Sequence, residues 1–280
     1  MATSRSQPEI STMTREPLKP FLKWAGGKRW MFESGQFATP EFTGRYIEPF
    51  LGGGAVFFET RPRRSILSDS NERLIEVYLA IRDDVQRLVP LLHSHARLHS
   101  TSYYYETRSR NYSDLTERAA QFLYLNRTCW NGLYRENLKG NFNVPIGTKQ
   151  TVILATDNFD AWSTALHGAI ISAADFEETI DLAGEGDFVF ADPPYTVRHN
   201  MNGFVKYNQN IFAWQDQVRL RDAIRRATDR GAKFAITNAD HESVRDLYKD
   251  FGHQRRLGRH SVIAAKATHR SHSTELLITS

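Results

Sequence analysis

Three apolar runs that each end on polar residues constrain the fold of this chain more than any other feature. They are AIISAADF at 169–176, DFVFADPPY at 187–195 and AKFAITNAD at 232–240. A short apolar run bounded by turn residues is typical of a strand buried on both faces. A helical pattern at 215–230 lies between the last two runs and stops at Gly231. Strands that alternate with helices in this way predict a parallel α/β sheet.

The N-terminal part shows the same alternation. The stretch RYIEPFLGGGAVFFETR at 45–61 predicts a short strand, a glycine turn and a short helix. The stretch RRSILSDSN at 63–71 predicts a second strand that ends in Asp69. Asn71 is placed to cap the helix that follows. Both halves of the chain therefore contribute strands to one sheet.

The strand pattern disappears between residues 72 and 157, where helical patterns prevail. Within this region, CWNGLYRENLKGNFNVPIGTK at 129–149 has neither helical nor strand period, and a loop this long and aromatic usually carries a function. We predict one catalytic α/β domain, formed by 16–71 and 158–280, with a helical recognition module inserted at 72–157 and a mobile lead-in at 1–15.

Composition restricts the class of protein and its surroundings. The 280 residues carry a net charge of +4, which is compatible with nucleic acid but does not require it. The chain contains no run of about 18 uncharged apolar residues, so we expect no membrane span. Cys129 is the single cysteine, which excludes an internal disulfide and suits a reducing compartment. We therefore expect a cytoplasmic protein, in a bacterium or a phage-infected cell.

Polar and glycine residues follow four of the predicted strands, where open α/β sheets bind ligands. Gly52 to Gly54 would let the backbone approach a ligand, although three glycines are also a common tight turn. Asp69 could accept hydrogen bonds from ribose hydroxyls, or it could cap the next helix. A dehydrogenase that binds a dinucleotide would use the same two features, so they do not identify the cofactor.

The quartet Asp192-Pro193-Pro194-Tyr195 discriminates further. If the substrate is the exocyclic amine of a nucleobase, the Asp192 carboxylate and the Pro193 carbonyl can each accept one N–H and localise the nitrogen lone pair. The two prolines stiffen the backbone, and Tyr195 offers a ring on which the base can stack, worth about 1–3 kcal/mol. Local propensity explains the same corner equally well as a simple turn.

At this point the chain resembles the Dam-like DNA adenine-N6 methyltransferases, of the DPPY-containing alpha type. The similarity is carried, in the family's order, by FLKWAGGK at 21–28, EPFLGGGAVF at 48–57, LYLNR…NGLYRENLKGNFNVPIG at 123–147 and DPPY at 192–195. It implies a Rossmann-like class I methyltransferase sheet with an inserted DNA-recognition module. The implied cofactor is S-adenosylmethionine, which leaves as S-adenosylhomocysteine, and no metal is expected.

The resemblance also implies which residues bind the cofactor and the target adenine. The expected cofactor contacts are Trp24, Lys28, Phe50, Gly52, Gly53, Gly54, Asp69, Asp175, Phe176 and Asp192. Among them, Lys28 suits a carboxylate, Asp69 the ribose, and Phe176 with Asp175 the adenine ring of the cofactor. The expected catalytic residues are Asp192, Pro193, Pro194 and Tyr195, which hold the target base.

Residues 72–157, together with Lys23, are expected to read the DNA. Lys23 and Arg135 resemble guanine readers, and Leu133 and Pro145 resemble apolar contacts to a thymine methyl group. Trp130 corresponds to an aromatic that fills the space left by a flipped adenine. The further expected DNA contacts are Asn126, Arg127, Asn131 and Asn137, of which the first two and the last suit a structural role as well. Thr148 and the segment 264–273 depart from the family pattern.

We therefore expect site-specific methylation of adenine N6 in duplex DNA, at GATC or a related short palindrome. The expected partner is double-stranded DNA, bound by a monomer or a weak dimer, with a cognate restriction enzyme as an optional partner and no membrane. Two alternatives stay open at this point. One is a methyltransferase that acts on RNA or a protein amide, and the other is a DNA-binding regulator that retains only cofactor binding.

Overall fold

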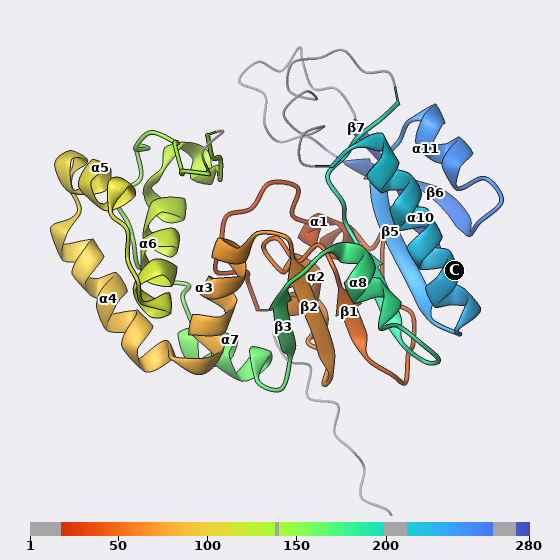
Figure 1. The fold of residues 1–280 in the computed structure, drawn as a ribbon, viewed down its shortest axis with the longest axis horizontal. Coiled ribbons are helices and arrows are strands. Elements are labelled where there is room, and N and C mark those ends of the chain that lie inside the picture. Colours follow the sequence, from red (N-terminus) through yellow and green to blue (C-terminus); the bar gives the residue numbers. More distant parts are fainter. Residues whose placement is uncertain (1–17, 138–139, 199–211, 260–272) are drawn as a thin grey trace, which may run out of the picture.

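The structure is a computed structural model, and it describes residues 18–137, 140–198, 212–259 and 273–280. These residues form a seven-stranded central sheet with the order β3-β2-β1-β4-β5-β7-β6 (Figure 1). Strands β1 to β5 run parallel, and β7 runs antiparallel to both β5 and β6. The strands are β1 (Tyr46–Glu48), β2 (Ser65–Asp69), β3 (Ile170–Ala173), β4 (Phe188–Ala191), β5 (Lys233–Ala239), β6 (His253–Arg259) and β7 (Ser273–Thr279).

Every apolar run named above forms a strand of this sheet. The three runs with polar ends become β3, β4 and β5, and the N-terminal pair becomes β1 and β2. The predicted Rossmann-like α/β sheet is therefore confirmed. The predicted lead-in, and residues 264–272 of the departing segment, lie outside the described residues.

Helices cover both faces of the sheet. One face is covered by α8 (Phe176–Asp181), α10 (Trp214–Asp229) and α11 (Glu242–Leu247). The other is covered by α1 (Arg29–Glu33), α2 (Ala55–Thr60), α3 (Glu72–Asp83) and α7 (Phe159–Leu166). Neighbouring strand residues face opposite ways, so Tyr46 belongs to one core and Ile47 to the other. This double burial is the reason that the central strands β1 and β4 are buried at every position.

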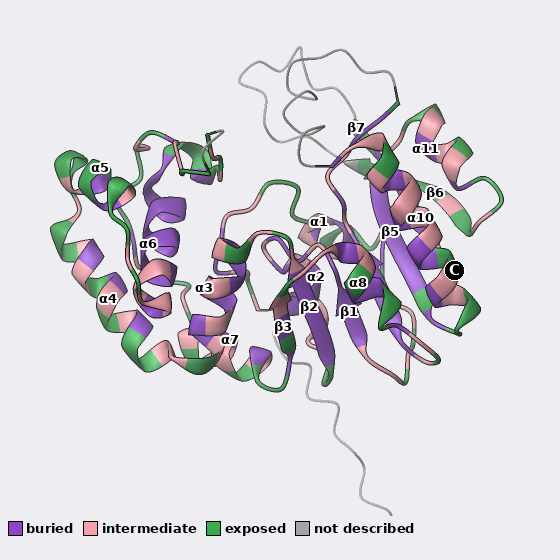
Figure 2. Ribbon diagram, viewed as in Figure 1, coloured by how far each residue is buried: buried purple, intermediate pink, exposed green. Residues whose placement is uncertain are grey.

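The inserted helices lie beside the sheet, on its β3 side (Figure 1). They are α4 (Val85–Leu98), α5 (Thr101–Ser109), α6 (Leu115–Thr128) and the short 3-10 turn η1 (Trp130–Gly132). Because α3, α4 and α5 all pack on α6, that helix is buried along most of its length (Figure 2). No helix in the described part of the chain is long and apolar enough to cross a membrane.

Helix α3 connects the insert to the sheet. It packs on β2 and β3 on one side and on α6 on the other. Its N-terminus is capped by Asn71, whose Oδ1 accepts a hydrogen bond from the Leu74 amide, as the sequence predicted. The same apolar cluster runs from Leu67 of the sheet to Leu123 of α6. The recognition module proposed at 72–157 therefore shares a continuous core with the catalytic part.

Candidate functional site

The carboxyl ends of four neighbouring strands meet at one edge of the sheet. β3, β2, β1 and β4 are adjacent and parallel, so the residues that follow them lie on the same side. This convergence was predicted from the sequence, and it brings together Glu48–Gly54, Asp69, Asp175 and Asp192–Tyr195. We refer to these four segments as the sheet edge. Open α/β sheets bind their ligands at such an edge.

The glycine turn after β1 is fixed by the packing of the protein itself. Gly52 and Gly54 have φ angles of +48° and +66°, a region that favours glycine. A Cβ at Gly52 would lie 2.7 Å from the Trp24 ring, and a Cβ at Gly54 would lie 2.8 Å from the Tyr78 hydroxyl. Gly53 between them is half-buried. The turn alone therefore accounts for Gly52 and Gly54, and a ligand contact for all three stays a prediction.

Asp69 fastens this turn to β2. Its Oδ2 accepts a hydrogen bond from the Gly52 amide at 2.9 Å, and its Oδ1 accepts one from the Asn71 amide at 3.0 Å. Asn71, not Asp69, caps α3, so the capping alternative for Asp69 is wrong. Burial raises the pKa of Asp69, although the backbone amides lower it. A half-buried carboxylate fixed in this way keeps further lone pairs for ligand hydroxyls.

An aromatic cluster lies beside the glycine turn. The rings of Phe50 and Phe176 stack at 5.2 Å between centroids, and Phe212 packs 5.6 Å from each of them. The Arg219 guanidinium lies 4.8 Å above the Phe176 ring. Phe50 stays half-buried. The cluster offers the apolar surface that a nucleoside ring needs, next to the carboxylate of Asp69 and the glycine turn, and these groups fit the expected cofactor.

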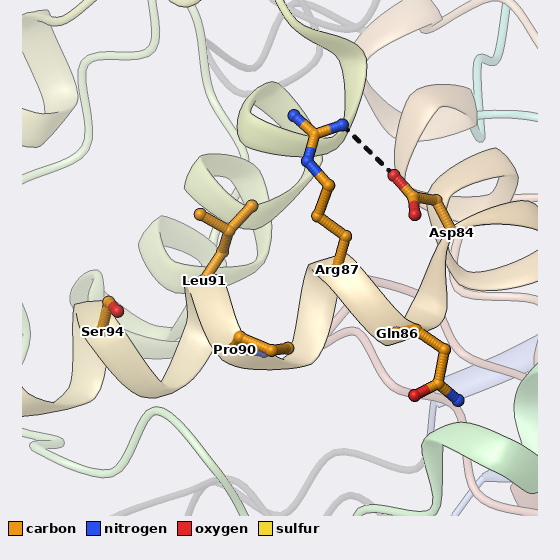
Figure 3. A pocket seen from close by; sticks show the side chains of 6 residues that line it. All are labelled: Asp84, Gln86, Arg87, Pro90, Leu91 and Ser94. Atoms are coloured by element: carbon orange, nitrogen blue, oxygen red, sulfur yellow. Dashed lines mark hydrogen bonds and ion pairs between the residues drawn. The ribbon is translucent and has the colours of Figure 1, made fainter.

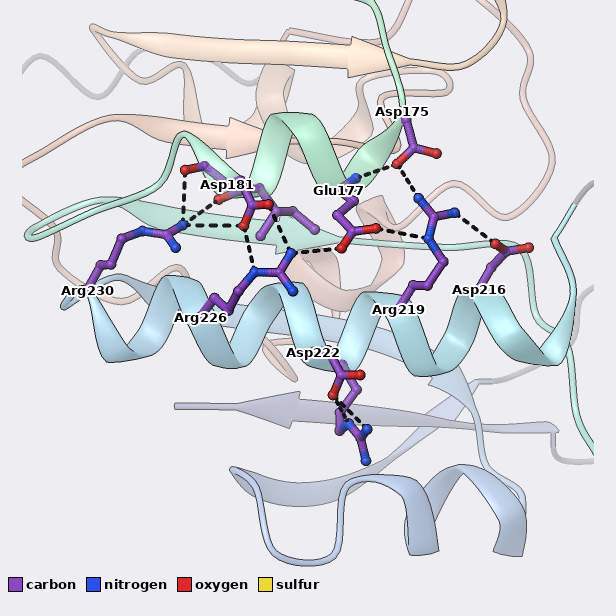
Figure 4. Close-up of polar contacts among 10 residues, drawn as sticks. Asp175, Glu177, Asp181, Asp216, Arg219, Asp222, Arg226 and Arg230 are labelled. Carbon is purple, nitrogen blue, oxygen red and sulfur yellow. Dashed lines mark hydrogen bonds and ion pairs between the residues drawn. The ribbon is translucent and has the colours of Figure 1, made fainter.

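Asp175 has a structural role in addition to the predicted cofactor contact. Its Oδ1 accepts hydrogen bonds from the Glu177 amide and from Arg219 Nη2, both at 2.9 Å. The first of these bonds makes Asp175 the N-terminal cap of α8. Arg219 and Arg226 of α10 extend this contact to Glu177 and to further acids of α8 (Figure 4). These pairs are half-exposed, so each contributes little stability, but together they fix α8 on α10.

Trp24 joins the N-terminal segment to the insert. Its ring stacks on Tyr134 at 5.7 Å and on Phe122 at 6.5 Å, and its other neighbours are Gly52 and Gly53. The indole therefore lies between the glycine turn and the residues of the inserted module. Its contact with a cofactor stays a prediction.

A buried charge cluster surrounds the quartet after β4. Asp192 Oδ1 accepts a hydrogen bond from the Thr237 hydroxyl at 2.6 Å, and Asp192 Oδ2 lies 2.9 Å from Lys28 Nζ. The same ammonium donates to the Gly26 carbonyl and lies 3.6 Å from Glu275 Oε2. Lys28 is only 3% exposed. The cation that the resemblance assigned to a cofactor carboxylate is thus paired with carboxylates of the protein in this structure.

Tyr195 is fixed by the same cluster. Its hydroxyl donates a 2.6 Å hydrogen bond to Glu275 Oε2, and Lys28 Nζ lies 5.0 Å from the centre of its ring. Burial and the nearby carboxylates raise the pKa of Tyr195 well above its ordinary value, so the phenol stays neutral. Burial also raises the pKa of Asp192, which Lys28 and Thr237 lower and Glu275 raises further. Pro193 is buried and Pro194 is half-buried.

Sequence reasoning missed the roles of three residues at or beside the sheet edge. Glu275 lies on β7, and only the antiparallel return of that strand beside β5 brings it to Tyr195. Thr237 lies within β5 and showed no motif. Glu48 ends β1, is 2% exposed and accepts a hydrogen bond from the Tyr46 hydroxyl. Burial, together with the charges of Asp192 and Asp69, raises the pKa of Glu48 to about 8.

Backbone contacts and the packing of Tyr134 on Trp24 and Phe122 hold the segment 129–149. Isolated antiparallel bridges join Cys129 to Ile146 and Glu136 to Phe142. The Trp130 amide also donates to the Pro145 carbonyl at 2.9 Å. The side chains expected to read DNA point outward: Trp130 is 51% and Leu133 46% exposed, and Asn131, Arg135, Asn137 and Pro145 are exposed as well.

Lys23 lies against this segment despite its distance in the sequence. Its backbone amide and carbonyl are both hydrogen-bonded to the Asn126 side chain. Its own side chain crosses Gly132, where a Cβ would lie 2.5 Å from Lys23 Cδ. Partial burial and the neighbouring charge of Lys149 lower the pKa of Lys23. Lys149, which sequence reasoning did not select, therefore adds an exposed cation beside the half-buried Lys23.

Two residues expected to contact DNA have structural roles instead. Asn126 is 1% exposed, and its side chain bonds to the backbones of Lys23 and Gly132. Arg127 is 2% exposed and forms a two-pronged ion pair with Asp157, at 2.5 and 3.0 Å. Because burial removes both side chains from the surface, the DNA contacts expected of them are corrected to structural ones.

Two other features lie apart from the sheet edge. A hollow of about 480 Å³ on the surface of α4 is lined by Asp84, Gln86, Arg87, Pro90, Leu91 and Ser94 (Figure 3). Cys129 is buried, and burial raises the pKa of its thiol to about 11, which suits a packing residue. Among the described residues, no group of three His, Cys, Asp or Glu side chains is placed to hold a metal ion.

A family model and the similar proteins of known name all point to DNA methyltransferases. The sequence model of the D12 class N6 adenine-specific DNA methyltransferases matches residues 24–262. A type II methyltransferase of Lactococcus lactis subsp. cremoris is 36% identical over 272 residues, which cover 94% of this chain and 95% of that protein. A DNA adenine methylase of Haemophilus influenzae is 32% identical, with 82% of each chain covered. A DNA N-6-adenine-methyltransferase of Escherichia phage P1 is 38% identical over 84% of this chain and 31% of its own length.

Proposed function

Because this chain belongs to the D12 class N6 adenine-specific DNA methyltransferases, we propose that it methylates adenine N6 at GATC or a related short palindrome, after the base has left the duplex. Enzymes that act on a base must bring it out of the stack, since its reacting atom is otherwise out of reach. Relatives named DNA adenine methylase support adenine in DNA as the target. The catalytic part is a class I methyltransferase sheet.

The observation that supports this function best is the placement of Asp192–Tyr195 beside the glycine turn. Parallel pairing of β4 with β1 puts the quartet and the turn at one edge. S-adenosylmethionine, when bound, supplies an electron-poor methyl group and leaves as S-adenosylhomocysteine. Phe50, Gly52–Gly54, Asp69 and Phe176 are the groups proposed to hold it.

The chain's own residues orient the target amine. The Asp192 carboxylate and the Pro193 carbonyl accept its two N–H groups, which directs the nitrogen lone pair away from the ring. Tyr195, held by Glu275, supplies the stacking surface. Thr237 keeps one Asp192 oxygen fixed, so the carboxylate needs little reorganisation.

Lys23 and the exposed groups of the segment 129–149 are proposed to read the duplex. Lys23 and Arg135 would donate to guanine edges, and Leu133 and Pro145 would contact thymine methyl groups. Trp130, a large apolar side chain that is 51% exposed, would fill the space left by the flipped adenine. Asn131 and Asn137 are proposed to contact the backbone of the DNA.

The name of one relative supports a proposal about the functional partner of this chain. The Lactococcus relative is a type II methyltransferase, and this name supports a cognate restriction enzyme as a functional partner. We propose that the chain acts on double-stranded DNA in the cytoplasm, as a monomer or a weak dimer. RNA and protein amides are the rival acceptors, and competition between DNA, RNA and peptide in one reaction separates them.

The direct test incubates the protein with S-adenosylmethionine labelled in its methyl group and DNA that lacks adenine methylation. We expect label in duplex DNA, with N6-methyladenine located at one short palindrome by single-molecule sequencing. Label in RNA or peptide alone would exclude the proposal, and methylation outside GATC-like sites would correct only the target sequence.

A further inference from the structure

Lys28 contacts Asp192, the residue that the proposed reaction requires as an acceptor for the target amine. Its Nζ lies 2.9 Å from Asp192 Oδ2, while Asp192 Oδ1 is bonded to Thr237. The proposed function, on which this inference rests, requires Asp192 to accept an N–H of the adenine. An ammonium in contact with the carboxylate neutralises it and competes for the same lone pairs. The carboxylate keeps further lone pairs, but it becomes a stronger acceptor for the amine once Lys28 gives up part of this contact.

Glu275 is a second carboxylate within reach of the ammonium. Its Oε2 lies 3.6 Å from Lys28 Nζ, against 2.9 Å for Asp192, and the residue is only 7% exposed. Strand pairing fixes its backbone on both sides, opposite Ala239 of β5 and Leu257 of β6. A small movement of the Lys28 side chain thus exchanges one carboxylate for the other without leaving a buried cation unpaired.

Glu275 also holds the residue that receives the base. The oxygen that faces Lys28 is the one that accepts the Tyr195 hydroxyl at 2.6 Å. Lys28 Nζ itself lies 5.0 Å from the centre of the Tyr195 ring. One carboxylate therefore contacts both the cation that has to move and the ring on which the adenine stacks.

We infer that Glu275 is a positioning residue for methyl transfer, which takes up the ammonium of Lys28 when the target amine binds Asp192. Separating a buried cation from its partner is costly, so without the charge of Glu275 the ammonium stays on Asp192. The amine then meets a carboxylate whose charge Lys28 neutralises. Glu275 acts only through Lys28 and Tyr195.

The test is a double-mutant cycle of Glu275→Gln and Lys28→Met, with kcat and KM measured on the cognate duplex. Gln keeps the size of the side chain and an oxygen acceptor for Tyr195, but it removes the charge. We expect Glu275→Gln to lower kcat at least about tenfold and Glu275→Asp to recover part of the loss. In the Lys28→Met background the same change should matter less than about threefold. Equal losses in both backgrounds would overturn the inference.

A binding measurement decides the matter if Lys28→Met has no measurable turnover. The cognate duplex is compared with one that has an abasic site in place of the target adenine, because only the first must displace Lys28. We expect Glu275→Gln to weaken the adenine duplex about tenfold relative to the abasic one, a difference of about 1.4 kcal/mol. Equal weakening would reject the role of Glu275. Failure of the proposed function would appear earlier, as no methyl transfer to DNA by the unmodified chain.

Discussion

The sheet edge and the segment 129–149 differ in how far their functional side chains are buried. At the sheet edge, Lys28 is 3% exposed and its ammonium lies between two carboxylates. In the segment 129–149, Trp130 is 51% exposed, and the contacts that fix it come from the backbone. One region buries its charges against one another, and the other leaves the side chains expected to read DNA exposed.

This difference follows from what each region has to do. Fixed electrostatics act strongly only where water is excluded and the groups cannot reorganise. Reading a duplex requires the opposite, because donors and apolar groups must reach base edges in a groove. Substitutions at the sheet edge should therefore change chemistry, and those in the segment 129–149 should change sequence preference.

The largest expected effect separates chemistry from cofactor binding. Asp192→Ala removes the proposed acceptor of the amine, and we expect kcat to fall about a thousandfold or more. Cofactor affinity, measured by calorimetry, should stay measurable, since the glycine turn and Asp69 are untouched. Asp222→Asn on α10, away from the sheet edge, is the matched control. A parallel loss of turnover and cofactor binding would contradict the role given to Asp192.

The next prediction compares two arginines of the inserted region. Arg127→Met leaves the buried carboxylate of Asp157 without its ion-pair partner, so we expect the free energy of unfolding to fall by about 3–5 kcal/mol. Arg135→Met changes an exposed side chain and should cost less than about 0.5 kcal/mol. Urea unfolding of both variants measures the difference. Similar stabilities would show that the Arg127–Asp157 pair is not structural.

The preference for the DNA sequence, unlike stability, should depend on Arg135. Arg135→Ala should reduce the discrimination between cognate and near-cognate duplexes by about 1–3 kcal/mol, because a guanine reader is lost. The measurement is kcat/KM on duplexes with one changed guanine, with Arg97→Ala on α4 as the exposed control. An unchanged preference would remove Arg135 from the readers and leave Lys23 and Lys149 as the cations to examine.

Sequence reasoning predicted the central strands well because they are buried on both faces. β4 is apolar and buried at every position, and β5 is buried at all but its two end positions, so local pattern and tertiary role agree. The convergence of their ends with β1 and β2 then followed from parallel pairing. Asn71 as a helix cap is likewise a local property.

The polar contacts at the site could not be predicted in the same way. Glu275 reaches Tyr195 only because β7 returns antiparallel to β5, and no local pattern indicates that pairing. Arg127 and Arg135 lie in one stretch, and only the packing of α6 shows that the first is buried. Similarity to a family aligns residues along the chain, but it does not say which of them face inward.

The smallest effect tests whether the sheet edge makes stability depend on pH. Glu48 is 2% exposed, and burial, with the charges of Asp192 and Asp69, raises its pKa from 4.5 to about 8. Such a carboxyl binds its proton more tightly in the folded than in the unfolded state. Its contribution to stability is therefore complete below about pH 4.5 and is lost as the pH rises through about 8.

We therefore expect the free energy of unfolding to decrease between about pH 6 and about pH 7, by up to about 1 kcal/mol from this group. Glu48→Gln keeps the shape of the side chain and cannot ionise, so it should remove that part of the slope. Arg135→Gln, in the segment 129–149, should keep it. Urea titrations at the two pH values measure all three chains. A slope that persists in Glu48→Gln would mean that Glu48 is already ionised in the folded protein, and the buried edge would then hold one more negative charge beside Asp192.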